Sequence, residues 1–131
     1  MSACLDAWAV LAWLDGEQPA AARVEAAIAE RPTMSWINAV EVYYRLERDH
    51  GRSTADETLA ELRSVIEVEL PGVARMVDAA RIKATLAIAL GDCFALATAA
   101  ARGVPLLTGD PEIAELADSP CAIEDLRGHE T

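Results

Sequence analysis

The stretch from Gly91 to Asp110 constrains the fold of this chain more than any other. An alanine-rich segment follows Asp92 and ends at Gly103, a residue type that accepts the left-handed backbone with which many helices end. The next residues, 104–107, are a short apolar run typical of a strand buried on both faces of a parallel sheet. Ligand crevices in open α/β sheets lie at the carboxyl ends of the strands, where Asp110 falls. The stretch therefore predicts one helix and one buried strand bracketed by two carboxylates.

Helix and strand signals alternate along the rest of the chain. We expect strands near residues 2–5, 33–35, 65–70, 104–107 and 121–123. We expect helices over about residues 7–14, 19–31, 36–49, 53–65, 73–90, 92–103 and 111–117. Ser35 or Asn38 is the expected cap of the third helix, and Ser53 is the expected cap of the fourth. Such alternation predicts an α/β fold with a central parallel sheet.

The length and composition predict a single domain over residues 1–131, with a core at about 3–126 and a frayed tail at 127–131. No apolar run approaches the roughly 18 residues that span a bilayer, and no basic leader precedes the first apolar segment. The three cysteines are scattered and lack CxxC spacing, which is typical of a reducing compartment. We therefore expect a soluble cytoplasmic protein without a membrane partner.

Charge argues against a general nucleic-acid binder. The net charge is -11, and such a surface repels phosphate backbones at long range while it attracts cations and basic partners. It does not argue against an enzyme whose acids hold metal ions.

Acidic side chains stand at strand ends or within apolar segments at four positions: Asp6, Glu41, Asp92 and Asp110. Each has an ordinary explanation when taken alone. Asp92 and Asp110 fit helix caps, which contribute ~1 kcal/mol each. Glu41 fits an ion pair with Arg45 one turn later, worth ~0.3–0.5 kcal/mol. Asp6 fits a turn that follows a strand.

Taken together, the same acids predict a cation site. If the first and fourth strands are neighbours, Asp6 and Asp110 share one edge of the sheet, and Asp92 and Glu41 can reach it. Close carboxylate pairs repel by about 4 kcal/mol at an effective dielectric constant of 20, which exceeds what capping returns. Such a cluster needs a bound cation or partial protonation. Oxygen-only ligands favour Mg²⁺ or Mn²⁺, and an acid-lined site with such ions suits phosphoryl chemistry.

These residues resemble those of PIN domains, and more closely those of VapC-type ribonuclease toxins of bacterial toxin–antitoxin pairs. The resemblance spans about residues 3–126 and is carried by the segments 5–12, 35–44, 91–99 and 103–110. The last of these ends in Thr108-Gly109-Asp110. Four acids in this order, together with that ending, make a specific pattern.

The resemblance implies a three-layer α/β/α fold and a Mg²⁺- or Mn²⁺-dependent endoribonuclease. It also implies a homodimer that is silenced by a small antitoxin. Asp6 and Asp92 fall on the family's principal metal ligands, while Glu41 and Asp110 complete the pocket, orient water or bind a second ion. Thr108 would hydrogen-bond within the pocket. The family often has Ser or Thr two positions after the first aspartate, where this chain has Trp8.

Other charged residues are weaker candidates. Three arginines that lie three to four residues apart, as on one helix, form a possible strip for RNA phosphates, although such strips are usually solvated: Arg45, Arg48 and Arg52. The acids after Asp110, including Glu112, are expected to be solvated charge without a catalytic part.

Two other functions stay open. The first is a PIN fold that mainly docks a basic antitoxin through its acidic face, with slow or lost catalysis. The second is a receiver-like signalling domain, which is also small, acidic and Mg²⁺-binding. A receiver needs an acceptor aspartate after a mid-chain strand and a lysine after a late one. Asp49 and Asp56 lie in helical or turn context, and Lys83 lies within a helix, so this alternative fits poorly.

Overall fold

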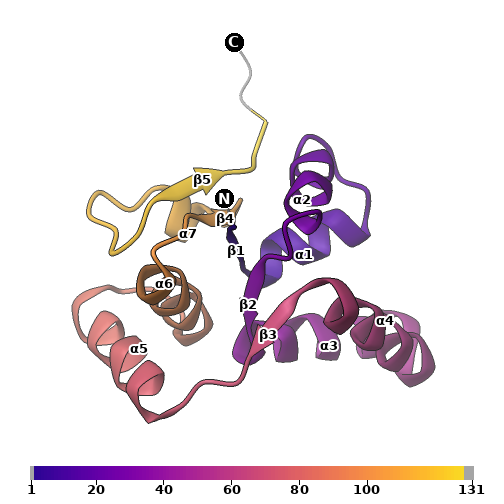
Figure 1. The fold of residues 1–131 in the computed structure, drawn as a ribbon, viewed down its shortest axis with the longest axis horizontal. Helices are drawn as coiled ribbons and strands as arrows, with labels where there is room; N and C mark the ends of the chain where they lie inside the picture. Colours follow the sequence, from indigo (N-terminus) through magenta and orange to yellow (C-terminus); the bar gives the residue numbers. More distant parts are fainter. Residues whose placement is uncertain (1, 129–131) are drawn as a thin grey trace.

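A five-stranded parallel sheet forms the centre of the molecule (Figure 1). The computed structural model describes residues 2–128. Its strands are β1 (Cys4–Leu5), β2 (Thr33–Ser35), β3 (Glu67–Glu69), β4 (Leu106–Thr108) and β5 (Ile123–Asp125). Their order in the sheet is β3-β2-β1-β4-β5. This order differs from the 2-1-3-4-5 order of flavodoxin-like folds, to which receiver domains belong, so the receiver-like alternative is wrong.

Strands β1 and β4 are direct neighbours in the sheet. Cys4 is opposite Leu106 and Leu5 is opposite Leu107. Because both strands run the same way, the residues that follow them meet at one edge of the sheet. The first condition for a shared acidic site, stated above from the sequence, is therefore met.

Seven helices surround the sheet within residues 2–128 and make two outer layers. They are α1 (Ala7–Leu14), α2 (Ala20–Ile28), α3 (Trp36–His50), α4 (Arg52–Val65), α5 (Val73–Thr85), α6 (Leu90–Arg102) and α7 (Pro111–Ala114). Figure 1 shows α1 to α4 on one side of the sheet and α5 and α6 on the other. The predicted three-layer α/β/α fold is confirmed.

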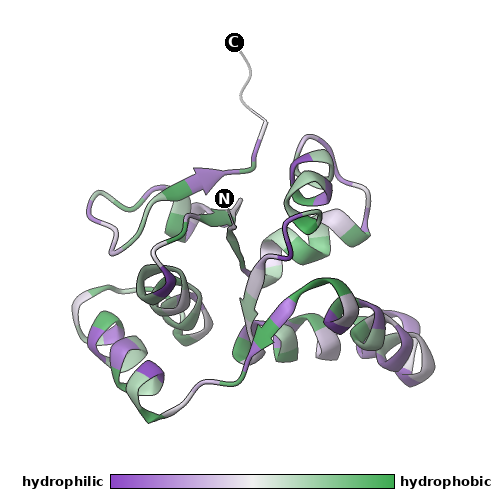
Figure 2. Cartoon of the chain, viewed as in Figure 1, coloured by the Kyte–Doolittle hydropathy of each residue, from purple (hydrophilic) through white to green (hydrophobic). Residues whose placement is uncertain are grey.

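Side chains of the central strands point alternately to the two faces of the sheet, and this explains why both helix layers have an apolar core. Leu5 and Leu107 join a core cluster with residues of α1 to α4, whereas Cys4 and Leu106 join a second cluster built mainly on α6. Successive side chains of a strand point to opposite faces, so two neighbouring apolar residues supply both cores. Figure 2 shows the hydrophobic colour on the central strands and α6, and much hydrophilic colour on the outer helix α4.

Several helix ends differ from the expected ones. Helix α5 ends at Thr85 instead of near residue 90, and α6 begins at Leu90 after an extended Ala89. Helix α4 begins at Arg52 with Gly51 as its cap, so Ser53 is inside the helix. Strand β5 lies two residues later than expected. Gly103 ends α6 with φ +63°, as the sequence predicts.

Ion pairs link the edge strand β3 to the helices α5 and α6. Glu69, whose side chain is 16 % exposed, pairs with Arg75 at 2.9 Å and with Arg102 at 3.1 Å. Arg102 also pairs with Glu67 at 3.1 Å. An exposed edge strand offers unpaired backbone groups, and charged side chains are a usual protection.

The end of the described chain is tied to the last strand. Arg127 pairs with Asp125 at 2.8 Å, and residues 129–131 of the expected tail lie outside the described residues. In the part of the chain that the structure covers, no helix combines the length and apolar character needed to cross a bilayer. The three cysteines there are free thiols.

Candidate metal centre

Asp6 is held at the end of β1 by two hydrogen bonds. It caps α1, and its Oδ1 accepts from the Ala9 backbone N at 2.8 Å. The Thr108 hydroxyl donates to its Oδ2. Asp6 is only 3 % exposed. Its carboxyl is therefore fixed in position before any ligand arrives.

Thr108 connects Asp6 to Asp110 across the two central strands. Its Oγ1 donates to Asp6 and accepts from the Asp110 backbone N at 3.0 Å. Asp110 caps the short helix α7, and its Oδ1 accepts from the Glu112 backbone N at 3.0 Å. The expected cap at Asp110 is confirmed. Capping engages one oxygen of that carboxylate and does not remove Asp110 from the site.

Asp92 does not cap α6, contrary to one expectation. The helix begins two residues earlier, so Asp92 lies in its first turn. Its Oδ2 is buried and has no hydrogen-bond partner among residues 2–128. A buried oxygen without a partner is costly, and a negative group near a helix N-terminus gains from the helix dipole. An unpaired carboxylate oxygen in this position is well placed to act as a ligand of a cation.

Glu41 reaches the same place from α3. It forms the expected ion pair with Arg45, at 3.7 Å, and both side chains are well exposed to solvent. A surface pair of this length contributes little to stability, so it leaves Glu41 available to a ligand. Glu41 Oε1 also lies 3.8 Å from the point where a Cβ on Gly91 would be, next to Asp92.

One small pocket of about 110 Å³ is lined by all four predicted acids. Its lining residues are Asp6, Ala7, Trp8, Asn38, Glu41, Arg45, Asp92 and Asp110. Segments that are far apart in the chain thus meet at the carboxyl end of β1 and β4. The structure places the acids together; their chemical roles remain predictions.

The surroundings of this pocket disfavour charged carboxylates. Burial, followed by the nearby charges of Asp92 and Asp110, raises the pKa of Asp6 to about 7 despite its hydrogen bonds. Burial, then Asp110, Glu112 and Glu41, raises the pKa of Asp92 to about 7. Both shifts mean that the empty protein holds protons that a cation would replace.

Glu112 was missed by the sequence analysis, which treated it as solvated charge. Carboxylate oxygens of Asp92, Asp110 and Glu112 lie within 4.8 Å of one another. Among residues 2–128, these three side chains form the group that is close enough together to hold one metal ion. Asp6 and Glu41 line the pocket but are not in that set. The spacing Asp110-Pro111-Glu112 was a usable signal, because a cap followed by a first-turn acid places both carboxylates near one helix start.

Trp8 stands two positions after Asp6, where the family often has Ser or Thr. Its ring packs so closely on Gly109 that a Cβ at position 109 would collide with it. The indole lines the pocket beside Asp6 and Asp110. The pocket therefore has an aromatic side chain, and no hydroxyl group, at this position.

The three arginines do not lie on one helix as expected, because Gly51 ends α3 and Arg52 is the first residue of α4. Arg48 pairs with Asp49 at 2.9 Å, and Arg52 pairs with Glu47 at 3.3 Å. Arg45 lines the acidic pocket, whereas Arg48 and Arg52 do not.

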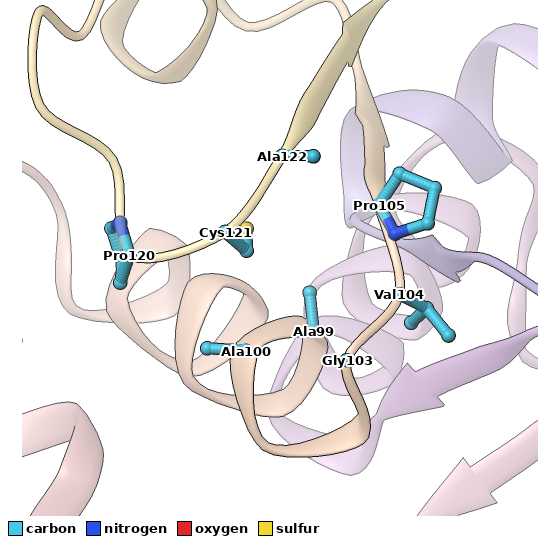
Figure 3. Close-up of a pocket in the computed structure, with 8 residues that line it drawn as sticks. All are labelled: Ala99, Ala100, Gly103, Val104, Pro105, Pro120, Cys121 and Ala122. Carbon is cyan, nitrogen blue, oxygen red and sulfur yellow. The ribbon is translucent and has the colours of Figure 1, made fainter.

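A larger hollow of about 460 Å³ lies elsewhere, between α6 and the segment before β5 (Figure 3). Pro105 and Ala122 precede β4 and β5, so this hollow is at the opposite end of the strands from the acids. Its eight lining residues include no carboxylate, and burial raises the pKa of the Cys121 thiol. It offers neither ligands for a hard cation nor a reactive thiolate.

The donor set of the acidic pocket fits Mg²⁺ or Mn²⁺. Its acidic side chains offer only oxygens, one buried carboxylate oxygen of Asp92 has no partner among residues 2–128, and burial raises the pKa of Asp6 and Asp92. A divalent cation would satisfy each of these features at once, because it is an electron-pair acceptor that favours the ionised carboxylates.

Solved structures share this fold. A chain of the DNA-bound VapBC from Salmonella typhimurium is 19 % identical with a TM-score of 0.77, and the match covers 97 % of this chain and 99 % of that one. VapBC2 from Rickettsia felis is 15 % identical with a TM-score of 0.75, covering 97 % and 100 %. VapC20 from Mycobacterium tuberculosis, described as a Sarcin-Ricin loop cleaving toxin, is 16 % identical with a TM-score of 0.71, covering 91 % and 98 %.

A comparison with curated proteins gives no match. The family model of the PIN domain matches residues 3–119, which is most of the chain. The match includes the four acids that line the pocket and also Glu112. The order of the strands, the paired carboxyl ends of β1 and β4 and the acidic pocket agree with that match. This chain belongs to the PIN domain family.

Proposed function

We propose that this protein is a Mg²⁺- or Mn²⁺-dependent endoribonuclease and the toxin of a toxin–antitoxin pair. The observation that carries the proposal is the pocket in which Asp6, Glu41, Asp92 and Asp110 converge while Asp92 keeps a buried oxygen without a partner among residues 2–128. Family membership and the described role of VapC20 as an RNA-cleaving toxin support the choice of RNA.

The surroundings of each acid indicate whether it would act as a metal ligand or as a proton acceptor. Asp6 and Asp92 would be the principal ligands, because Asp6 is fixed by two hydrogen bonds and Asp92 has a buried oxygen with no partner among residues 2–128. Asp110 and Glu112 complete the ligand set from the other side. Glu41, which is more exposed, can accept a proton from a water molecule that approaches the phosphodiester. A bound divalent cation supplies charge stabilisation for the phosphate and activates water.

Arg45 contributes the positive charge nearest to the pocket. Its guanidinium lies 3.7 Å from Glu41 and can turn to a phosphate oxygen when RNA binds. A phosphate in that position has its scissile bond beside the ligand carboxylates. The otherwise acidic surface thus has one local contact for an anionic substrate.

Substitution of Asp92 by Asn tests this proposal. Asp92→Asn keeps the size of the side chain and removes the charge that holds the cation, so cleavage of RNA should fall at least 100-fold. The measurement is mapping of cleaved RNA ends, where 5′-phosphate and 3′-hydroxyl ends are expected. Asp118→Asn, a change of the same kind at an exposed acid after α7, is the matched control. Wild-type cleavage rates in Asp92→Asn would contradict the assignment.

We further propose two protein partners in the cytoplasm. Exposed apolar residues around α5 suit the pairing of two copies: Leu70, Val73, Met76, Val77 and Leu90. A second apolar surface on α3 and α4 is lined by Trp36, Val40, Tyr43, Tyr44 and Leu59 and suits an antitoxin segment with basic flanks. A structural neighbour from Klebsiella pneumoniae is described as a toxin–antitoxin complex, which supports an antitoxin partner.

A second candidate function is a binding module that docks a basic antitoxin and cleaves slowly or not at all. The pairing of Arg48 and Arg52 with neighbouring acids favours it, because these arginines are then less available to RNA. Turnover of structured RNA with Mn²⁺ separates the two functions. Antitoxin binding without turnover would favour the module.

A further inference from the structure

Asn38 is a buried polar residue at the acidic pocket to which the proposed chemistry assigns no role. It lies on α3 one turn before Glu41, is 2 % exposed and lines the pocket. Its Nδ2 donates to the Gly91 backbone O at 3.0 Å. A carbonyl oxygen only accepts hydrogen bonds, so this contact fixes which end of the amide is the donor. The orientation of Asn38 is thereby set.

The other end of the amide, Oδ1, is buried and has no hydrogen-bond partner among residues 2–128. Burying an acceptor without a donor is unfavourable, and most such groups in proteins find a partner. The polar groups around it are mainly carboxylates, which accept when ionised. Two side chains with donor groups also line the pocket, Arg45 beside Glu41 and Trp8, and neither forms a hydrogen bond with Oδ1. A water molecule in the pocket would supply the donor that Oδ1 lacks among residues 2–128.

The size of the pocket limits what that partner is. A water molecule takes about 30 Å³ of liquid, so a pocket of about 110 Å³ holds a few waters or a hydrated ion. It is too small for a nucleotide, since ligand pockets for such molecules are about 300 Å³ or more. Asp92 Oδ2, the other unpaired buried oxygen, belongs to the same pocket.

We propose that Asn38 is a positioning residue of the cation site, with Oδ1 accepting a hydrogen bond from a water ligand of the cation. This inference rests on the proposed function, because it assumes that the carboxylates hold Mg²⁺ or Mn²⁺. The same side chain holds the first turn of α6 through Gly91, next to the ligand Asp92. One amide thus serves both the metal's hydration shell and the placement of one of its carboxylate ligands.

Mn²⁺ binding to Asn38→Leu tests the role of Oδ1. Leucine has a similar size and no polar atom, so the Kd for Mn²⁺ should rise about 10-fold or more, as outer hydrogen-bond partners of metal sites commonly contribute. The Kd is measured by electron paramagnetic resonance of free Mn²⁺, at pH 8 and without RNA. Water exchange on bound Mn²⁺, measured by proton relaxation, should become faster. Unchanged affinity and exchange in Asn38→Leu would overturn the inference.

A second variant and a control separate the role of the oxygen from that of folding. Asn38→Asp and Asn38→Leu both lose the donor to Gly91, but Asn38→Asp keeps an acceptor oxygen. Asn38→Asp should therefore bind Mn²⁺ more tightly than Asn38→Leu, and binding as weak as in Asn38→Leu would overturn the inference. Thr98→Val removes a buried hydrogen bond to the Phe94 O of 2.8 Å, away from the pocket. It should lower the melting temperature and leave the Kd unchanged. A wild-type protein that binds no Mn²⁺ would instead overturn the proposed metal site itself.

Discussion

Single residues at the acidic pocket are set by contacts that the sequence does not display. Trp8 lies against Gly109, and this contact makes a glycine necessary there for lack of space. Glu112 follows a proline and looks like surface charge in the sequence, yet the cap at Asp110 turns it toward Asp92. Trp8 and Glu112 each lie in the first turn of the helix that follows a central strand. The exact residue at which that helix begins decides which side chains face the pocket.

Gly109→Ala should destabilise the protein. The added methyl group meets the Trp8 ring, and overpacking of this kind costs about 1–3 kcal/mol of unfolding free energy. The measurement is urea unfolding. Gly72→Ala is the matched control, because nothing lies within 4 Å of a Cβ at Gly72 and its φ is negative, so its change should stay within about 0.5 kcal/mol. Equal effects of the two substitutions would contradict the steric explanation.

Glu112→Gln should weaken Mn²⁺ binding while the protein stays folded. Glu112 supplies one of three carboxylates within 4.8 Å of one another, and its charge favours a cation there. We expect the Kd measured by calorimetry to rise several-fold, less than in Asp92→Asn, because Glu112 is exposed. Glu115→Gln, at the end of the same short helix, provides the comparison and should bind Mn²⁺ as the wild type does.

At the level of helices and strands, much of the fold could be predicted from the sequence. Alternating signals and turn residues predict α1 and β2 correctly, and Gly103 marks the end of α6. The end of α5 could not be predicted, because residues 86–89 contain no helix breaker. That segment leaves the helix where Ile88 is buried in the core and its backbone O accepts from Lys83. Packing, and not local preference, decides such boundaries.

The same limit applies to the acids. Their order along the chain predicts that they meet, since β1 and β4 are neighbours, and this part could be derived from the sequence. The two-residue earlier start of α6 could not, and it is what releases Asp92 from a capping role. Asn38 was seen as a possible cap, but Ser35 holds that place and Asn38 lies at the pocket instead.

Glu69→Gln should destabilise the sheet edge without affecting the pocket. Glu69 receives hydrogen bonds from Arg75 and Arg102, and the hydrogen bond from Arg75 is the main cause of its lowered pKa. Loss of the charge should cost about 1–3 kcal/mol of unfolding free energy at neutral pH. Glu67→Gln, a more exposed acid on the same strand, should cost less than about 1 kcal/mol. A similar loss in both variants would show that exposure does not matter here.

For the whole molecule, charge and stability are connected through the acidic pocket. The chain carries a net charge of -11, and two of its carboxyls, Asp6 and Asp92, have a pKa raised to about 7 by burial and by neighbouring acids. Because their pKa is near 3.8 in the unfolded chain, the folded protein binds more protons between about pH 4 and pH 7. Stability without metal therefore falls as the pH rises through this range.

The unfolding free energy in EDTA should decrease from pH 5 to pH 8, and Mg²⁺ should restore it at pH 8. A cation that binds only the folded state stabilises it by mass action, and it binds better once the carboxyls have lost their protons. Urea unfolding at several pH values measures both effects. Asp92→Asn should show a shallower pH dependence and little response to Mg²⁺. Stability in EDTA that rises with pH would contradict the burial of these acids.

The adjacency of β1 and β4 has a consequence during translation. Thr108 contacts Asp6 across 102 positions of the chain, so Asp6 leaves the ribosome long before its partner exists. At roughly 5–20 residues per second, the delay is about 5–20 s. An unfinished nascent polypeptide that stops before Leu106 has neither β4 nor the aspartate beyond it. Such a fragment carries only part of the pocket, so the four acids can come together only after Asp110 has been added to the chain.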